Sequence, residues 1–354
     1  MARRSKKRFR FGVIGPGGAG RGRTFALAKD KAVEVVAAAD TSAECIDKLE
    51  EGLGHNVERF VGRNGYKKMI DRVELDAVGI FSPHTTHYDH AMYAFENGLH
   101  VLIEKPMVCG AGKAIETAKK AAERDLVYLI HYQRHFQPKY VTARKLIRQG
   151  AIGEVQSFYV YMAQDWRGWS WRGDPKYSGG GQLNDSGSHY QDILLYMTGL
   201  LPKSVRGSYD HYYHGQKRRV EINGSFSVEL SNGACGRLII VGDYIKGFND
   251  DVRILGDKGL ITFQGPDLFL SKLGKPPRKV ACKVPRGYPA NPCDNFARLL
   301  TGRTRKNYVP ALFGAQVALL TDGMLAAGRT GRKANCEAIL KRKGYSYADL
   351  AIND

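Results

Sequence analysis

Short apolar runs alternate with helix-forming segments through roughly the first 150 residues, and no other feature constrains the fold as strongly. The expected strands are residues 10–14, 34–39, 77–81, 100–103 and 126–130. The helix-forming segments between them are residues 19–28, 42–50, 88–96 and 113–123. Repeated strand–helix–strand units build a parallel sheet with helices on its faces. The pattern therefore predicts an α/β domain with a doubly wound parallel sheet.

Beyond Gly153 the pattern changes to longer runs in which apolar and polar residues alternate, as in antiparallel strands. These runs cover residues 155–162, 220–230 and 234–241, and hairpin signals occur at 231–233 and 257–259. Helical patterns return at 295–300 and 311–327. A chain of 354 residues is long enough for two domains. We expect the second to be α+β, with a large, mostly antiparallel open sheet.

The chain is strongly basic, with 54 Lys and Arg against 35 Asp and Glu and a net charge of +19. Six of the basic residues lie within the first ten positions: Arg3, Arg4, Lys6, Lys7, Arg8 and Arg10. Such charge favours anionic partners, and nucleic acid is one alternative. The tail has no aromatic residue before Phe9 and no recognised nucleic-acid motif accompanies it, so we do not expect nucleic-acid binding.

The N-terminal segment, the cysteines and the apolar runs indicate the cellular compartment. After the basic tail only residues 11–14 are apolar, too short a run for a secretory signal. The six cysteines are scattered without a C-x-x-C pair, as in reducing compartments. We found no apolar run approaching the roughly 20 residues of a membrane span. We therefore expect a cytoplasmic protein with no membrane partner and no structural zinc.

A G-x-G-x-x-G motif stands directly after the first expected strand. The candidate cofactor-binding residues of this turn are Gly15, Gly17, Gly18, Ala19 and Gly20. Such glycines let the backbone approach a pyrophosphate, whose charge the following helix N-terminus stabilises. Asp40 follows Gly20 by 20 residues, at the end of the second strand, where a carboxylate can bond ribose hydroxyls. The motif predicts dinucleotide binding over a merely structural turn, with NAD favoured over NADP because Asp40 would repel a 2′-phosphate.

Polar residues follow two more strands, at the edge where open α/β sheets bind ligands. Ser82-Pro83-His84-Thr85-Thr86-His87 follows residues 77–81, and Glu104-Lys105-Pro106 follows residues 100–103. The spacing of His84, His87 and His90 also suggests a metal site. No thiolate or carboxylate cluster completes such a site, so we expect no metal.

A glycine-rich segment, residues 179–181, leads into Asp185, His189 and Asp192, which would share one face of a helix. A carboxylate beside an imidazole orients a general base that works near neutral pH. The alternative is a solvated helix with a capping aspartate. Following a dinucleotide-binding domain, the constellation favours catalysis.

These motifs together resemble the glucose-fructose oxidoreductase and inositol dehydrogenase (Gfo/Idh/MocA) family of NAD(P)-dependent dehydrogenases. The resemblance covers nearly the whole chain. Besides the glycine turn and Asp40, it rests on Ser82-Pro83-x-x-x-His87, Glu104-Lys105-Pro106, Gly150-x-x-Gly153-Glu154, the segment from Gly179 to Asp192, and Gly328-Arg329-Thr330-Gly331-Arg332. Tyr132-Gln133-Arg134 departs from the family's frequent Asn-x-Arg, which leaves the substrate open.

The resemblance implies a division of the chain and a set of roles. Residues 1–9 would be a basic tail, 10–132 a Rossmann dinucleotide-binding domain, and 133–354 a substrate-binding and oligomerisation domain whose last helices could pack back on the first. Lys105, Asp185 and His189 match the family's catalytic residues, while Ser82, Pro83, His87, Glu104 and Lys105 itself match positions around the cofactor. The implied reaction is hydride transfer between nicotinamide and a hydroxyl-bearing carbon of a sugar or cyclitol, in a homodimer or homotetramer.

All three tryptophans fall within Trp166-Arg167-Gly168-Trp169-Ser170-Trp171. Indole faces could stack on a sugar while arginines bond its hydroxyls, so we expect Trp166, Arg167 and Trp169, with Asp185 and His189, to bind substrate. The alternative is a packing plug between domains or subunits. Arg134 and Arg172 join Arg167 as groups that could bind an anionic substrate.

Two other functions stay open at this point. Some relatives of the same fold are NAD-dependent glycosidases, which oxidise a sugar transiently and return the hydride. A non-catalytic nucleotide sensor is a second alternative, but it would not need Lys105, Asp185 and His189 together.

Overall fold

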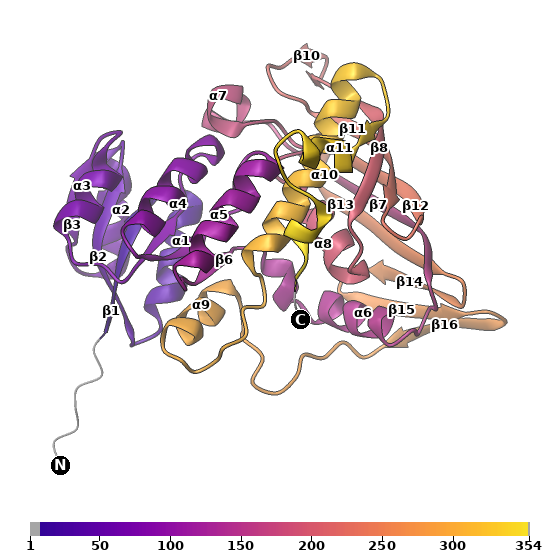
Figure 1. Cartoon of the computed structure of the whole chain (residues 1–354), viewed down its shortest axis with the longest axis horizontal. Coiled ribbons are helices and arrows are strands. Elements are labelled where there is room, and N and C mark those ends of the chain that lie inside the picture. Colours follow the sequence, from indigo (N-terminus) through magenta and orange to yellow (C-terminus); the bar gives the residue numbers. More distant parts are fainter. Residues whose placement is uncertain (1–7, 353–354) are drawn as a thin grey trace. The chain divides into compact units, whose positions relative to one another are not determined.

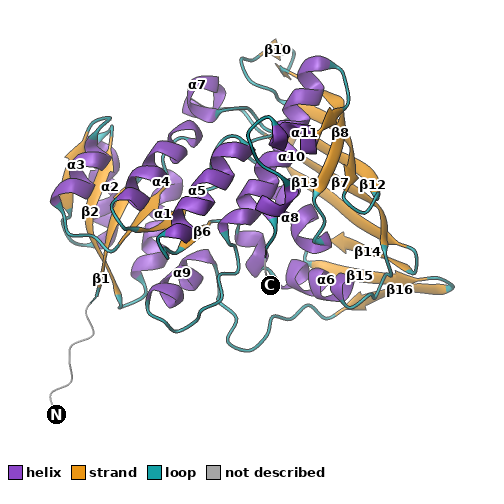
Figure 2. Ribbon diagram, viewed as in Figure 1, coloured by secondary structure: helices purple, strands orange, loops and turns teal. Residues whose placement is uncertain are grey.

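The structure is a computed structural model and describes residues 8–352. Its contacts divide the chain into two units. The first comprises the chain up to Val108, Lys113–His131 and Pro289–Ala311, and the second comprises Cys109–Gly112, Tyr132–Tyr288 and the chain from Leu312 onward. Figures 1 and 2 show their helices and strands.

The first unit is built on a six-stranded sheet in which every neighbouring pair is parallel. Its strands are β1 (Phe9–Ile14), β2 (Val33–Asp40), β3 (Glu58–Val61), β4 (Ala77–Ile80), β5 (His100–Ile103) and β6 (Tyr128–Ile130). The spatial order β3-β2-β1-β4-β5-β6 confirms the predicted doubly wound sheet. The order reverses between β1 and β4, and ligands of such sheets bind at this switch point.

Helices follow the strands of the first unit in turn. They are α1 (Gly18–Ala28), α2 (Ala43–Leu53), α3 (Gly65–Arg72), the 3-10 helix η1 (His84–Thr86), α4 (His87–Glu96), α5 (Ala111–Glu123) and α9 (Pro292–Leu300). α9 comes from far along the chain and begins after Asn291, whose side chain accepts a bond from the Asp294 N–H at 3.0 Å. Its Phe296 packs edge-on against Phe11 of β1. A late segment therefore completes the core around the central strand.

Strand β3 and helix α3 were not expected from the sequence. Only Phe60 of β3 is buried, and its neighbours Glu58, Arg59 and Val61 are exposed because the strand lies at the sheet edge. The central strands bury both faces, as Ala77–Ile80 does, and so appear as continuous apolar runs.

The second unit contains a nine-stranded sheet ordered β16-β15-β14-β13-β7-β12-β11-β8-β17. The strands are β7 (Val155–Asp165), β8 (Pro202–Asp210), β11 (Asn223–Leu230), β12 (Cys235–Val241), β13 (Asp243–Gly256), β14 (Gly259–Gln264), β15 (Asp267–Lys272), β16 (Lys275–Val280) and β17 (Ala334–Asn335). All neighbours are antiparallel except β7 and β12. This confirms the predicted large, mostly antiparallel sheet. A separate hairpin pairs β9 (Tyr212–Tyr213) with β10 (Gln216–Lys217).

Helices of the second unit lie on one side of this sheet, and Figure 1 shows α6, α8 and α10 there. The helical elements are η2 (Gln133–Phe136), α6 (Pro138–Arg148), η3 (Ser170–Gly173), α7 (Pro175–Ser178), α8 (Ser188–Thr198), α10 (Ala311–Thr330), α11 (Cys336–Lys341) and η4 (Tyr347–Leu350). Helix α8 packs against β7 and α6.

Helix α10 departs from the expectation that no segment is long and apolar enough to cross a membrane. It has 20 residues, and 72% of its most apolar window is buried inside the protein. Such burial is typical of the core helix of a globular protein, which passes the same test of length and composition.

Candidate active site

The glycine turn after β1 contains two glycines that the local packing requires. Gly15 has φ +80°, and a Cβ there would lie 2.7 Å from the Ser82 backbone nitrogen. A Cβ on Gly20 would lie 2.3 Å from the Gly15 carbonyl oxygen. The turn can therefore close against β4 and α1 only with glycine at these positions.

Gly17 and Gly18 differ, because a Cβ at either would meet nothing within 4 Å. Gly17 is the N-cap of α1, with no side-chain cap bond, and Ala19 lies in the first turn. The first amides of the helix thus lack partners within the helix, and the space in front of them is open. An open, uncapped helix N-terminus fits a pyrophosphate, and the role of these residues in holding a dinucleotide stays a prediction.

Asp40 ends β2, the neighbour of β1, as predicted. Its Oδ1 accepts a bond from the Ser42 N–H at 2.9 Å, which fixes the carboxylate beside the turn into α2. This is the position from which a carboxylate reaches ribose hydroxyls in doubly wound folds.

The loops after β4 and β5 are joined by His87, which is fully buried. One ring nitrogen lies 2.8 Å from the Ser82 carbonyl oxygen, and the other lies 2.9 Å from that of Pro106. The Ser82 hydroxyl lies 2.9 Å from His90 Nδ1, and burial lowers the pKa of His90 to about 3. These residues shape the loops, and within the described part of the chain no group of His, Cys, Asp or Glu is arranged to hold a metal.

Glu104 is buried just after β5, and its carboxylate is hydrogen-bonded to other groups of the protein. It accepts a bond from Arg23 Nε of α1 at 2.7 Å and one from the Lys105 N–H at 3.1 Å. Burial alone would raise the pKa of Glu104, but His131 and the Arg23 guanidinium outweigh it and hold that pKa below its usual value. An ionised Glu104 therefore fixes the backbone that carries Lys105, which follows β5 at the ligand-binding edge of the sheet.

In the second unit, Asp185 and His189 lie on either side of the start of α8. Asp185 precedes the helix, and His189 is in its first turn, with its ring edge-on to Tyr132 at 6.2 Å. The prediction that Asp185, His189 and Asp192 share one helix face is wrong for Asp185, which precedes α8, whereas His189 and Asp192 are three residues apart on that helix. Asp192 lies 2.8 Å from His135 Nε2 and both side chains are fully buried, so this pair connects α8 to η2 within the core.

Asp185 contacts the tryptophan-rich loop, which the sequence did not indicate. Its Oδ2 accepts bonds from Trp166 Nε1 at 2.9 Å and from Arg172 Nε at 3.2 Å. Trp166 is only 5% exposed and packs with Tyr213, Val220 and Ile222, so its ring faces are covered by protein. Trp169 is 67% exposed, and its expected role in substrate binding stays a prediction.

The arginines expected at an anionic substrate differ in their partners. Arg167 pairs with Asp165 at 3.0 Å, and Arg172 pairs with Asp185. Arg134 stacks on Tyr190 at 4.6 Å instead, and its buried Nη1 has no hydrogen-bond partner among the described residues.

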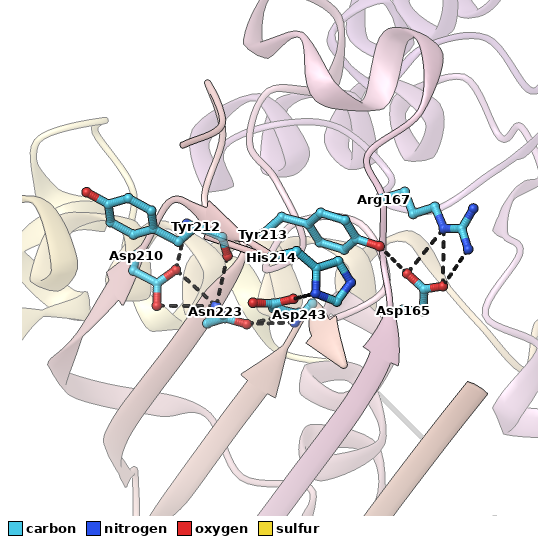
Figure 3. Close-up of polar contacts among 9 residues, drawn as sticks. Asp165, Arg167, Asp210, Tyr212, Tyr213, His214, Asn223 and Asp243 are labelled. Atoms are coloured by element: carbon cyan, nitrogen blue, oxygen red, sulfur yellow. Dashed lines mark hydrogen bonds and ion pairs between the residues drawn. The ribbon is translucent and has the colours of Figure 1, made fainter. Parts of the chain in front are cut away.

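The β9–β10 hairpin lies beside the end of β7. Figure 3 shows Tyr213 and Arg167 both bonded to Asp165, and His214 in contact with Asp243. The His214 Nδ1–Asp243 Oδ1 distance is 3.1 Å. Asn223 joins the base of the hairpin to β13, since its amide bonds Asp210 and its carbonyl oxygen accepts from the Asp243 N–H.

Comparison with known proteins shows two family matches. Residues 9–132 match the model of an oxidoreductase family with an NAD-binding Rossmann fold, and residues 140–262 match the GFO/IDH/MocA C-terminal domain. Together the two segments cover more than two thirds of the chain.

Among curated relatives, the rhizopine catabolism protein MocA of Rhizobium meliloti is 32% identical over 203 residues, 56% of this chain and 60% of that protein. The scyllo-inositol 2-dehydrogenase (NAD(+)) of Bacillus subtilis is 28% identical, over 61% of this chain and 64% of its own. The matches therefore span less than two thirds of either relative. A solved levoglucosan dehydrogenase in complex with NADH shares the fold, with a TM-score of 0.79, 19% identity, and coverage of 93% of this chain and 99% of that one.

Proposed function

Because the chain belongs to the Gfo/Idh/MocA family of NAD-binding oxidoreductases, we propose that it transfers a hydride between NAD and a hydroxyl-bearing carbon of a sugar or cyclitol. The observation that carries the proposal is the open, uncapped N-terminus of α1 behind Gly17 and Gly18. Lys105 at the end of β5, and Asp185 and His189 at the start of α8, supply the remaining chemistry.

Bound NAD would supply the hydride acceptor, held at its pyrophosphate by the glycine turn and at its ribose by Asp40. His189 takes the proton of the substrate hydroxyl as a general base. Asp185 orients the imidazole and stabilises its cationic form. Lys105 donates to the reacting oxygen and stabilises the negative charge that develops there.

The names of the relatives support a polyhydroxylated substrate. A scyllo-inositol dehydrogenase and a levoglucosan dehydrogenase act on a cyclitol and on a sugar derivative. Arg134 further supports a substrate with an anionic group, because a buried guanidinium N–H without a partner is costly unless a ligand or water satisfies it.

The test is to identify by mass spectrometry the cofactor that copurifies with the protein, and then to screen a panel of sugars, cyclitols, uronates and sugar phosphates for NADH formation. We expect NAD and net NADH with at least one panel member. Release of an aglycone without net NADH would instead indicate the redox-assisted glycosidase. Turnover of neutral sugars alone would exclude the anionic substrate, and a protein that binds no nicotinamide nucleotide would refute the proposal.

We also propose a homo-oligomer in a reducing, cytoplasmic location. Support for the location comes from the six cysteines, all of which are free thiols in the structure. Support for the assembly comes from the large sheet, whose face opposite α6, α8 and α10 carries no helix among the described residues in Figures 1 and 2.

A further inference from the structure

The loop that carries the three tryptophans holds Asp185 through two side chains. Trp166 Nε1 and Arg172 Nε both donate to Asp185 Oδ2, at 2.9 and 3.2 Å. We infer that Trp166 and Arg172 are positioning residues, which fix the orientation of Asp185 and keep it ionised for its work with His189. This inference rests on the proposed function, because it deepens the role of Asp185 in that reaction.

Burial makes these contacts necessary. Asp185 is 4% exposed, and a carboxylate removed from water is stable only if it is paired and hydrogen-bonded. The indole of Trp166 has one N–H donor, which when buried also needs a partner. Both donors bind the same oxygen, so Oδ2 is committed to the loop.

Trp166 is itself held rigidly. Its ring packs with Tyr213, Val220 and Ile222, and its backbone N–H donates to the Gly242 carbonyl at 2.9 Å. Gly168, with φ +59°, allows the loop to fold back, since a Cβ there would lie 3.0 Å from the Trp166 ring. A buried indole packed among these side chains holds its N–H at one place, as a positioning group must.

The other charged groups of this region have partners of their own. Arg167 is bidentate to Asp165, which also accepts from the Tyr213 hydroxyl (Figure 3). His214 Nδ1 lies 3.1 Å from Asp243 Oδ1, and an ion pair joins Arg219 to Asp174 at 3.3 Å. Arg172 is a cation that contacts Asp185 Oδ2, and His189 follows on α8. An adjacent guanidinium favours the ionised carboxylate.

The three tryptophans allow a direct test by NMR of the full-length protein without ligand. Indole N–H resonances from only three tryptophans are expected, and the Trp166→Phe variant assigns that of Trp166. The Asp185→Asn variant should shift the Trp166 resonance, because it replaces the charged acceptor. Asp174→Asn, which removes a carboxylate of the same region that has other partners, is the control and should leave that resonance in place. A Trp166 resonance that does not respond to Asp185→Asn would overturn the inference.

Arg172 is tested through the pH at which the Trp166 resonance titrates. Removing the Arg172 guanidinium, which contacts Asp185 Oδ2, should move this titration midpoint to higher pH in Arg172→Gln, and Arg172→Lys should restore most of the wild-type midpoint. Arg219→Gln, which breaks the exposed ion pair with Asp174, should leave the midpoint unchanged. An unchanged midpoint in Arg172→Gln would refute the role of Arg172.

If a sugar from the substrate screen reduces NAD, the effect of losing the Arg172 contact on catalysis can also be measured. The acid limb of the pH profile of kcat/KM should move to higher pH in Arg172→Gln together with the Asp185 midpoint, and a profile that does not move would show a merely structural contact. The NMR measurements need neither cofactor nor substrate. A failure of the proposed hydride transfer would leave them intact, so the two hypotheses fail separately.

Discussion

At the scale of single residues, the glycines of the turn after β1 have two different roles: Gly20 is required by packing, and Gly17 is expected to serve ligand binding. Gly20 faces the Gly15 carbonyl oxygen so closely that Gly20→Ala should lower the free energy of unfolding by about 1–3 kcal/mol. Gly17 faces open space, so Gly17→Ala should change that free energy by less than about 0.5 kcal/mol yet weaken NADH binding. Urea unfolding and a fluorescence titration with NADH check both. Equal losses of stability in the two variants would contradict this account of the turn.

Asp40 should determine the choice between NAD and NADP. Asp40→Ala removes a bond to ribose and a charge that repels a 2′-phosphate, so NAD binding should weaken and its advantage over NADP should narrow. The measurement is the dissociation constant of NAD and of NADP for the wild type and for Asp40→Ala. Tighter binding of NADP by the unchanged protein would show that our interpretation of Asp40 is wrong.

Where the signal is local, the sequence predicted where the candidate residues lie in the fold. The glycine turn, Asp40 and Lys105 stand at strand ends that short motifs already define. It did not predict that Asp192 pairs with His135, or that Trp166 binds Asp185, because each partner lies far along the chain and only packing of the second unit brings them together.

At the scale of elements, the junction of β4, β5 and α4 should weaken in acid. Burial lowers the pKa of His90 to about 3, so as the pH falls below about 6.5 the unfolded chain takes up a proton before the folded one does. The stability from neutral His90 is therefore complete above that pH and is lost as the pH falls toward the folded pKa. Between pH 6.5 and 5 the loss from this residue should be roughly 1–2 kcal/mol.

The test is to measure the free energy of unfolding between pH 6.5 and 5 for the wild type and for His90→Gln. The variant keeps a polar partner for Ser82 but has no imidazole to protonate, so its stability should fall less steeply with pH. His55→Gln, on an exposed histidine of the same unit, is the control. Parallel curves for the wild type and His90→Gln would show that His90 does not make this contribution.

Whether the sequence predicted a strand or helix depended on how much of that element is buried. The central strands of the first unit, buried on both faces, and β7, β11 and β12 of the second unit were predicted, because their apolar pattern is strong. The β3 edge strand and β16, which carries Pro276 and Pro277 and is largely exposed, lack that signal. Helix α9 was predicted as a helix, but its place in the core of the first unit depends on Phe11, nearly 300 residues earlier, and no local pattern encodes it.

At the scale of the whole molecule, the open face of the nine-stranded sheet should mediate self-association. Tyr161 of β7 lies opposite Ile239 of β12, both are partly exposed, and Leu255 of β13 is 44% exposed. Charges at the centre of an apolar interface are costly, so Tyr161→Glu combined with Ile239→Glu should yield a monomer in light scattering. Val61→Glu, on exposed β3, should keep the wild-type mass. A wild-type protein that is monomeric at micromolar concentration would contradict the proposed assembly.

The central claim is that Lys105 and His189 are both catalytic residues of the proposed hydride transfer. The most direct measurement is the rate of NADH formation by the wild type, Lys105→Ala and His189→Ala at saturating NAD with a panel substrate that turns over. We predict that each variant loses at least about 100-fold in kcat while its NADH dissociation constant stays close to that of the wild type. Wild-type rates in either variant, at full occupancy with NAD, would contradict the claim.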